Sequence, residues 1–162
     1  MQVAILSDIH DHLENLARVL AEVRGMDLLL CLGDLCAPFT LDELAKGFPG
    51  PVQVTFGNND GDIFLLTQIA RRHPNVTLAA PMGEVEAAGQ KLAFVHYPIY
   101  GEGLAALGRY DAVFCGHSHK PDQRTIGSTL LANPGEVMGR FGEVSYGVWD
   151  TGTRAYTRKV VP

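Results

Sequence analysis

The sequence has 162 residues, of which 46% are hydrophobic and 19% are charged, and its formal net charge is -5. A chain of this length can bury about 70% of its unfolded surface without disulfides, so we expect one domain over residues 1–162. The negative charge and the absence of a basic run argue against a stable nucleic-acid complex, and no apolar run approaches the roughly 18 residues of a membrane span.

The first half of the chain alternates between apolar strands and amphipathic helices. Asp11 and Thr40 each precede a glutamate by three residues, which is the spacing of a capping box, so we expect each to begin a helix. The pattern predicts strands over Gln2–Leu6, Asp27–Leu32 and Val52–Phe56, and helices over Asp11–Gly25, Thr40–Gly47 and Ile63–Arg72.

The second half is predicted to consist mostly of strands and turns, with one weak helix over Gly103–Leu107. The expected strands are Val76–Leu78, Gly83–Ala87, Lys91–Val95, Ala112–Cys115, Gln123–Ile126, Thr129–Ala132, Glu143–Asp150 and Arg154–Val161. This order of elements predicts an α/β fold in which two sheets, one from each half of the chain, pack face to face with helices outside.

Polar side chains that can bind metal ions follow the apolar strands, always at the same end. They are Asp8, His10, Asp34, Asn58, His96, His117 and His119. Because ligands of open α/β sheets bind where the strands end, we expect these side chains to converge on one rim. The alternative, seven unrelated polar residues, does not explain why they share one position relative to the strands.

The donor types indicate the kind of metal centre. Carboxylate, amide and imidazole donors without a thiolate suit manganese, iron, zinc, cobalt or nickel, of which we favour manganese. Seven ligands exceed the needs of one catalytic ion, so we predict two divalent ions about 3.5 to 4 Å apart, with one carboxylate bridging them. Two aspartates and a hydroxide leave such a centre with a net positive charge, which would attract a small phosphate ester.

The motifs, taken in order, resemble those of the calcineurin-like metallophosphoesterases, and the short chain resembles the small bacterial and archaeal phosphodiesterase branch. The motifs are Asp8-Ile9-His10, Gly33-Asp34, Gly57-Asn58-Asn59-Asp60, His96 and Gly116-His117-Ser118-His119. Asn133-Pro134-Gly135 extends the resemblance. The resemblance implies a four-layer αββα sandwich and a dimetal phosphodiesterase that uses in-line attack by a bridging hydroxide.

The resemblance also implies a role for each ligand. It assigns Asp8, His10 and His119 to one ion, Asn58, His96 and His117 to the other, and Asp34 to both. A phosphomonoesterase with the same mechanism is one alternative. A non-catalytic binding protein with the same fold is the other.

Three residues are predicted to serve catalysis: Asp34 as the bridge, Asn59 beside the substrate, and Asp60 as a hydrogen-bonding partner of the ligands. Many members of the family have a histidine in place of Asn59, and that histidine is thought to stabilise the transition state or to protonate the leaving oxygen. Asparagine donates a hydrogen bond but no proton at neutral pH, so we expect a preference for diesters or other substrates with good leaving groups, unless His12 or a water supplies the acid.

Other residues near the motifs are predicted to have no part in the chemistry. We expect Asn15 on the helix surface, Cys36 packed in a loop, and Phe141 and Trp149 in the core or an interface. Three cysteines without a C-x-x-C pair or a signal segment predict a cytoplasmic protein. A homo-oligomer is left open.

Overall fold

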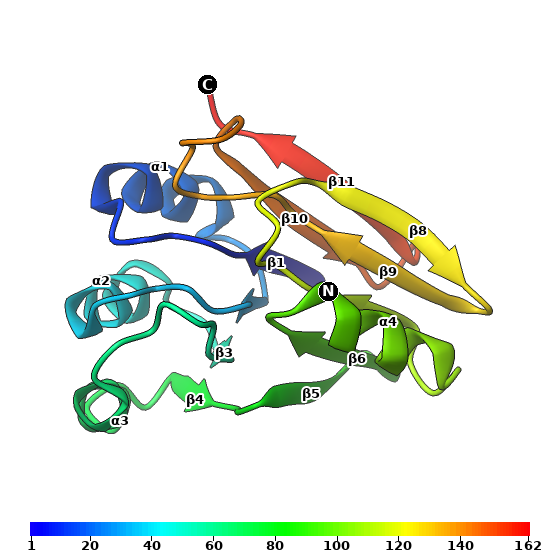
Figure 1. Ribbon diagram of the computed structural model, residues 1–162, viewed down its shortest axis with the longest axis horizontal. Coiled ribbons are helices and arrows are strands. Elements are labelled where there is room, and N and C mark those ends of the chain that lie inside the picture. Colours follow the sequence, from blue (N-terminus) through cyan, green and yellow to red (C-terminus); the bar gives the residue numbers. More distant parts are fainter.

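Two β-sheets pack face to face, and helices cover both outer faces (Figure 1). The computed structural model describes all residues from 1 to 162. The six-stranded sheet has the order β11-β10-β1-β2-β3-β4. Its strands are β1 (Gln2–Leu6), β2 (Leu28–Cys31), β3 (Val52–Val54), β4 (Val76–Leu78), β10 (Ser145–Asp150) and β11 (Ala155–Val160).

The second sheet has five strands in the order β5-β6-β7-β9-β8. These are β5 (Met82–Ala87), β6 (Gln90–Val95), β7 (Ala112–Phe114), β8 (Asp122–Ile126) and β9 (Thr129–Asn133). The helices are α1 (Leu13–Val23), α2 (Pro38–Gly47), α3 (Ile63–Ala70) and α4 (Pro98–Ala106). The longest of them, α1, has 11 residues, and none has the length and apolarity needed to span a membrane.

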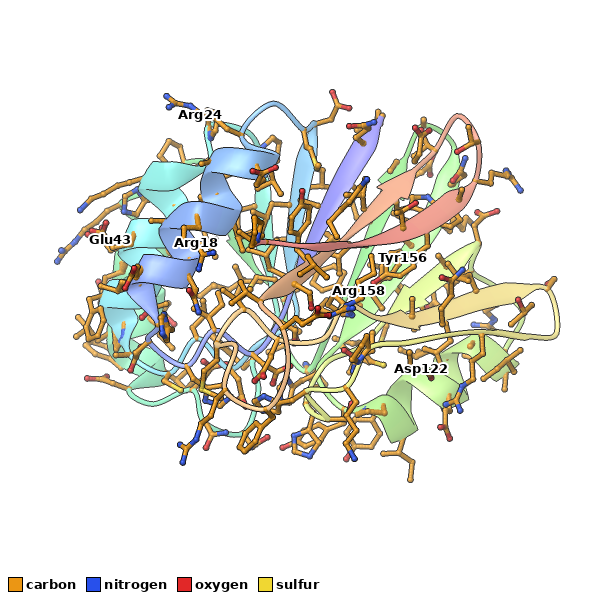
Figure 2. The ribbon with its side chains drawn as sticks, turned by 90° about the horizontal axis from the view of Figure 1, so that it is seen from above. Arg18, Arg24, Glu43, Asp122, Tyr156 and Arg158 are labelled. Atoms are coloured by element: carbon orange, nitrogen blue, oxygen red, sulfur yellow. The ribbon has the colours of Figure 1, made fainter.

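Strand β1 shows why the chain forms layers. Its side chains alternate between two faces, so Val3 and Ile5 pack between the sheets while Ala4 and Leu6 pack under the helices. Both faces are fully buried, which explains the continuous apolar run in the sequence. Tyr156 also lies between the sheets, whereas Arg24 lies on the outside of the helical layer (Figure 2). The predicted αββα sandwich is therefore confirmed.

The prediction that each half of the chain forms one sheet is wrong. Strands β10 and β11 come from the C-terminal part of the chain but join the N-terminal sheet, where β10 pairs antiparallel with β1. Without β10, strand β1 would be an edge strand with unpaired backbone groups, although both of its faces are buried. Pairing with β10 satisfies those groups.

Both predicted capping boxes are also wrong. Helix α1 begins at Leu13, and His12 Nδ1 accepts a hydrogen bond from the Asn15 amide at 3.2 Å. The Asp11 carboxylate instead accepts from the Ala37 amide at 2.8 Å and from the hydroxyl of Thr40, which lies inside α2. Asp11 therefore joins the loops that follow β1 and β2, and both loops carry predicted ligands.

Helix α4 is longer than predicted. It begins at Pro98, five residues before the expected start at Gly103. Proline fits the first helical position because the amide it lacks would have no partner there. The early start places the first turn of α4 directly after His96, so this helix helps to form the predicted rim.

Candidate metal centre

Parallel strands bring the predicted ligands to one edge of the sandwich. Strands β1, β2 and β3 run parallel in the first sheet, and β6 and β7 run parallel in the second. Donor atoms from these strand ends form two overlapping groups, each with all atoms within 4.8 Å of one another. The groups are Asp8, His10 and His119, and Asp8, Asp34 and His96.

The first group surrounds an oxygen atom that has no partner. Asp8 Oδ1 lies 3.9 Å from His10 Nε2 and 3.5 Å from His119 Nε2, and the two imidazole rings stack with centroids 5.0 Å apart. Asp8 Oδ1 and His10 Nε2 are both buried and make no hydrogen bond. Buried polar atoms normally find a partner, so two that converge without one fit a bound cation.

The second group has acceptor atoms that face one another. His96 Nδ1 is 2.8 Å from the Leu32 carbonyl, which can only accept, so Nδ1 carries the proton. In the neutral ring Nε2 is then an acceptor, yet it faces Asn58 Oδ1 at 3.2 Å and Asp34 Oδ2 at 3.5 Å. These three atoms repel one another unless Nε2 takes up a second proton or a cation lies between them, and their donor types fit a divalent metal ion.

Asp34 lies between the two groups. Its Oδ2 atom is 3.4 Å from His10 Nε2 and 3.5 Å from His96 Nε2. The ring of His117 completes the set, since its centroid is 5.1 Å from that of His96, while its backbone amide donates to Asp8 Oδ2 at 3.0 Å. All seven predicted ligands therefore meet at one rim, with residue 34 at the centre.

The pKa values of the buried groups are shifted in different directions. Burial alone would raise the pKa of Asp34, but hydrogen bonds with His96 and Asn59 outweigh it and lower that pKa. Burial raises the pKa of Asp8 above its usual value. For His96, burial opposes the charged form, yet the neighbouring Asp34 carboxylate raises the pKa overall. A carboxylate at the centre thus remains ionised at neutral pH and can attract cations.

The ligand loops have unusual backbone conformations. Five predicted ligands have a φ between 46° and 66°, the left-handed region that non-glycine residues rarely adopt: Asp8, His10, Asp34, His117 and His119. Such conformations cost free energy and are common at functional sites. Gly57 permits the close approach of two of these loops, since a Cβ there would lie 2.1 Å from Asp34 Oδ1.

Asp60 and Asn59 hold Asp34 in place. The Asp60 carboxylate accepts hydrogen bonds from the backbone amides of Asp34, Cys36 and Gly57 at 2.7 to 3.0 Å. The Asn59 side chain donates to Asp34 Oδ2 at 2.8 Å, and its backbone amide donates to Oδ1 at 2.8 Å. Both residues therefore contact the central carboxylate or the backbone that carries it.

Sequence reasoning missed Glu136 and misplaced Asn15. The Glu136 carboxylate is 1% exposed and accepts from His119 Nδ1 at 2.7 Å; only its position after Asn133-Pro134-Gly135 hinted at the site. Asn15 is buried rather than on the surface, and it donates to the Met138 carbonyl at 3.0 Å. Phe141 is 70% exposed, which contradicts a place in the core but not one in an interface, whereas Trp149 is buried as predicted.

Cys36 lies beside the first group, with Sγ 3.3 Å from His10 Nδ1. Burial, followed by the neighbouring carboxylates of Asp11 and Asp34, raises the pKa of the Cys36 thiol to about 12. A protonated thiol reacts slowly with oxidants, which favours the packing role that the sequence predicted.

Replacing Asp8 by Asn is expected to stabilise the metal-free protein and to weaken binding of the metal ion that Asp8 would hold together with His10 and His119. A carboxyl group whose pKa is raised by folding contributes stability below its unfolded pKa, and that contribution is lost as the pH rises through the folded value. At pH 7 the neutral amide should therefore raise the free energy of unfolding of the metal-free protein.

The measurement is thermal unfolding at pH 7, in chelator and then in excess Mn²⁺. Wild-type protein should gain about 2.7 kcal/mol for each bound ion when free metal reaches roughly 100 times the Kd of that ion, whereas D8N should lose the gain from the ion that Asp8 would hold. A D8N variant that melts below wild type in chelator, or that keeps the full metal-dependent gain, would contradict this expectation.

Two packed sheets gather carboxylate and imidazole donors at their strand ends, and these donor types can hold divalent metal ions. The chain belongs to the calcineurin-like phosphoesterase superfamily, since the model of that superfamily domain matches residues 1–154. The resemblance seen in the motifs is thereby confirmed.

Several relatives cover nearly the whole chain. Phosphodiesterase MJ0936 of Methanocaldococcus jannaschii is 27% identical over 166 residues, which is 99% of each chain. Phosphodiesterase YfcE of Escherichia coli is 29% identical over 167 residues, covering 93% of this chain and 88% of the relative. A solved structure described as a novel archaeal phosphodiesterase superposes with a TM-score of 0.90 at 26% identity, covering 99% of both chains.

Proposed function

We propose that the protein is a phosphodiesterase that holds two divalent metal ions and hydrolyses a small phosphate ester. The observation that carries this proposal is the position of Asp34, whose Oδ2 atom lies 3.4 Å and 3.5 Å from imidazole nitrogens of the two ligand groups. A carboxylate in this place can serve both ions. We assign Asp8, His10 and His119 to one ion and Asn58, His96 and His117 to the other.

When bound, two divalent ions would activate a hydroxide for in-line attack on phosphorus and stabilise the charge on the phosphoryl oxygens. The chain fixes the geometry of this reaction. Hydrogen bonds to Leu32 and Glu136 hold His96 and His119 with their Nε2 atoms toward the centre. Asp60 and Asn59 fix the backbone and both oxygens of Asp34. We propose manganese as the metal, with iron, zinc, cobalt or nickel as substitutes.

The surroundings of Asn59 support a substrate with a good leaving group, and the names of two relatives support a diester. Its side-chain amide donates to Asp34 Oδ2 at 2.8 Å, and an amide cannot deliver a proton to a leaving group. His12 Nδ1 accepts the Asn15 amide in the cap of α1. A substrate with a good leaving group needs no strong acid, and two relatives are named phosphodiesterases.

A non-catalytic binding protein is not favoured by this geometry. Five ligands in left-handed conformations and two buried atoms without partners cost folding free energy. A surface that only bound a protein partner would gain nothing from that cost, whereas a bound cation would offset it.

We expect metal-dependent hydrolysis of aryl phosphodiesters at a kcat/KM at least about tenfold above that of alkyl phosphomonoesters, which equals about 1.4 kcal/mol in the transition state. The measurement is a panel of mono-, di- and cyclic phosphates, each with Mn²⁺, Zn²⁺, Co²⁺, Ni²⁺ or chelator. Activity in chelator equal to that with metal would refute the two-metal proposal. Equal rates on alkyl monoesters would refute the diester preference alone.

A further inference from the structure

The buried carboxylate of Glu136 contacts both the candidate metal centre and the loop over residues 134–144, which connects β9 to β10. Glu136 Oε2 accepts from His119 Nδ1 at 2.7 Å, while Oε1 accepts from the backbone amides of Phe141 and Gly142 at 2.6 and 2.7 Å. With only 1% of Glu136 exposed, both oxygens are used entirely within the protein. One side chain therefore positions a metal donor and a surface loop together.

The start of this loop is tied to the first ligand segment. The backbone amides of Val137 and Met138 donate to the carbonyls of Ser7 and Asp8, both at 3.0 Å, and Asn15 donates to the Met138 carbonyl at 3.0 Å. Hydrogen bonds to Ser7, Asp8 and Asn15 fix residues 137 and 138, and hydrogen bonds to Glu136 fix residues 141 and 142. The position of residues 139–142 is therefore defined.

The loop presents an aromatic ring at the edge of the centre. Phe141 is 70% exposed, and its ring centroid lies 5.2 Å from that of His119 with the planes at 89°. The guanidinium of Arg140 lies 5.5 Å from the same ring and adds positive charge there. An exposed phenylalanine ring beside His119, on a backbone that Glu136 holds through the amides of Phe141 and Gly142, is well suited to contact an aromatic group of a ligand.

We propose that Phe141 forms a subsite for an aromatic group on the phosphate ester, and that Glu136 is the positioning residue that aligns this ring with the His119 donor. This inference rests on the proposed phosphodiesterase function and adds the class of ester that the site prefers. Ring contact would strengthen binding of aryl esters without taking part in the bond-breaking step.

The ring is tested by calorimetry on the Mn²⁺-loaded protein with phenylphosphonate and methylphosphonate, which share the anionic group but contain no ester bond. Phe141→Ala is expected to weaken phenylphosphonate binding about five- to tenfold and to leave methylphosphonate binding unchanged. Leu107→Ala, which removes an exposed apolar side chain after α4, is the control and should change neither. Equal effects of F141A on both ligands, or none, would overturn the subsite.

Glu136 is tested with two substitutions. In Glu136→Gln the amide oxygen can still accept from Phe141 and Gly142, but the amide nitrogen then faces His119 Nδ1 and cannot accept its proton. We expect E136Q to weaken Mn²⁺ binding about 10- to 100-fold while keeping the preference for phenylphosphonate. Glu136→Ala should lose both, because the loop is released as well.

These outcomes separate the inference from the proposed function. Failure of the wild-type protein to hydrolyse any phosphodiester would refute the function, while the phosphonate and Mn²⁺ titrations would still report on the ring and the carboxylate. Wild-type Mn²⁺ affinity in E136Q would refute the positioning role.

Discussion

Asp34→Asn is expected to lower kcat by about a thousandfold or more, because the loss of a shared anionic ligand removes several kcal/mol of transition-state stabilisation and each 1.36 kcal/mol is tenfold. The asparagine would also direct a neutral amide toward His10 and His96, whose nitrogens lie 3.4 and 3.5 Å from the present carboxylate oxygen. Mn²⁺ stoichiometry by calorimetry and initial rates on an aryl phosphodiester measure the effect.

The matched control is Asp42→Asn, which neutralises a partly exposed carboxylate on α2 that pairs with Lys46 and His73. This variant should keep both the activity and the metal stoichiometry of the wild type. Circular dichroism will show whether D34N remains folded. A folded D34N variant with two bound ions and undiminished activity would show that residue 34 is not the shared ligand.

Gly116→Ala is expected to disrupt the centre through packing rather than chemistry. A Cβ at this position would lie 1.8 Å from Ser7 Oγ and 3.0 Å from Asp8 Oδ2, and both residues are fully buried. Overpacking of this kind costs about 1–3 kcal/mol. Since 1 kcal/mol shifts the Tm of a chain of this size by about 2–4 °C, the Tm should fall by roughly 2–12 °C.

The displaced Asp8 should also bind metal more weakly, which calorimetry with Mn²⁺ can detect. Gly103→Ala is the control, because it lies within α4 and a Cβ there meets nothing within 4 Å. That change should leave metal binding unaltered and increase stability slightly, since alanine favours helices more than glycine does. A G116A variant with wild-type Tm and affinity would mean that the loops relax freely.

The convergence of the seven predicted ligands could be foreseen because its signal in the sequence is local. Each follows an apolar strand, and parallel strands bring their ends together without any further information. Glu136 could not be found in this way, since its partner His119 lies on a different loop and no periodicity links the two. Asn15 was misplaced for the same reason, because the carbonyl that accepts its hydrogen bond belongs to Met138, which is distant in the sequence.

The sheets show the same division between local and long-range information. Strand positions follow from short apolar runs, but the pairing of β10 with β1 joins residues such as Val3 and Trp149 that no sequence window contains together. The capping boxes failed where a tertiary contact prevailed over a local one, since the Asp11 carboxylate binds Ala37 and Thr40 instead of its own helix.

The position of β1 between β2 and β10 determines when, relative to translation, the loop after β1 can reach its final structure. Asp8 and His10 leave β1 at its end, so their loop gains its final support only when residues 145–150 have emerged from the ribosome and docked. Closing so long a stretch of chain is slow compared with forming the hairpins and helices inside it. We therefore expect nascent chains that lack β10 to capture no metal, and loading with ions to follow translation rather than accompany it.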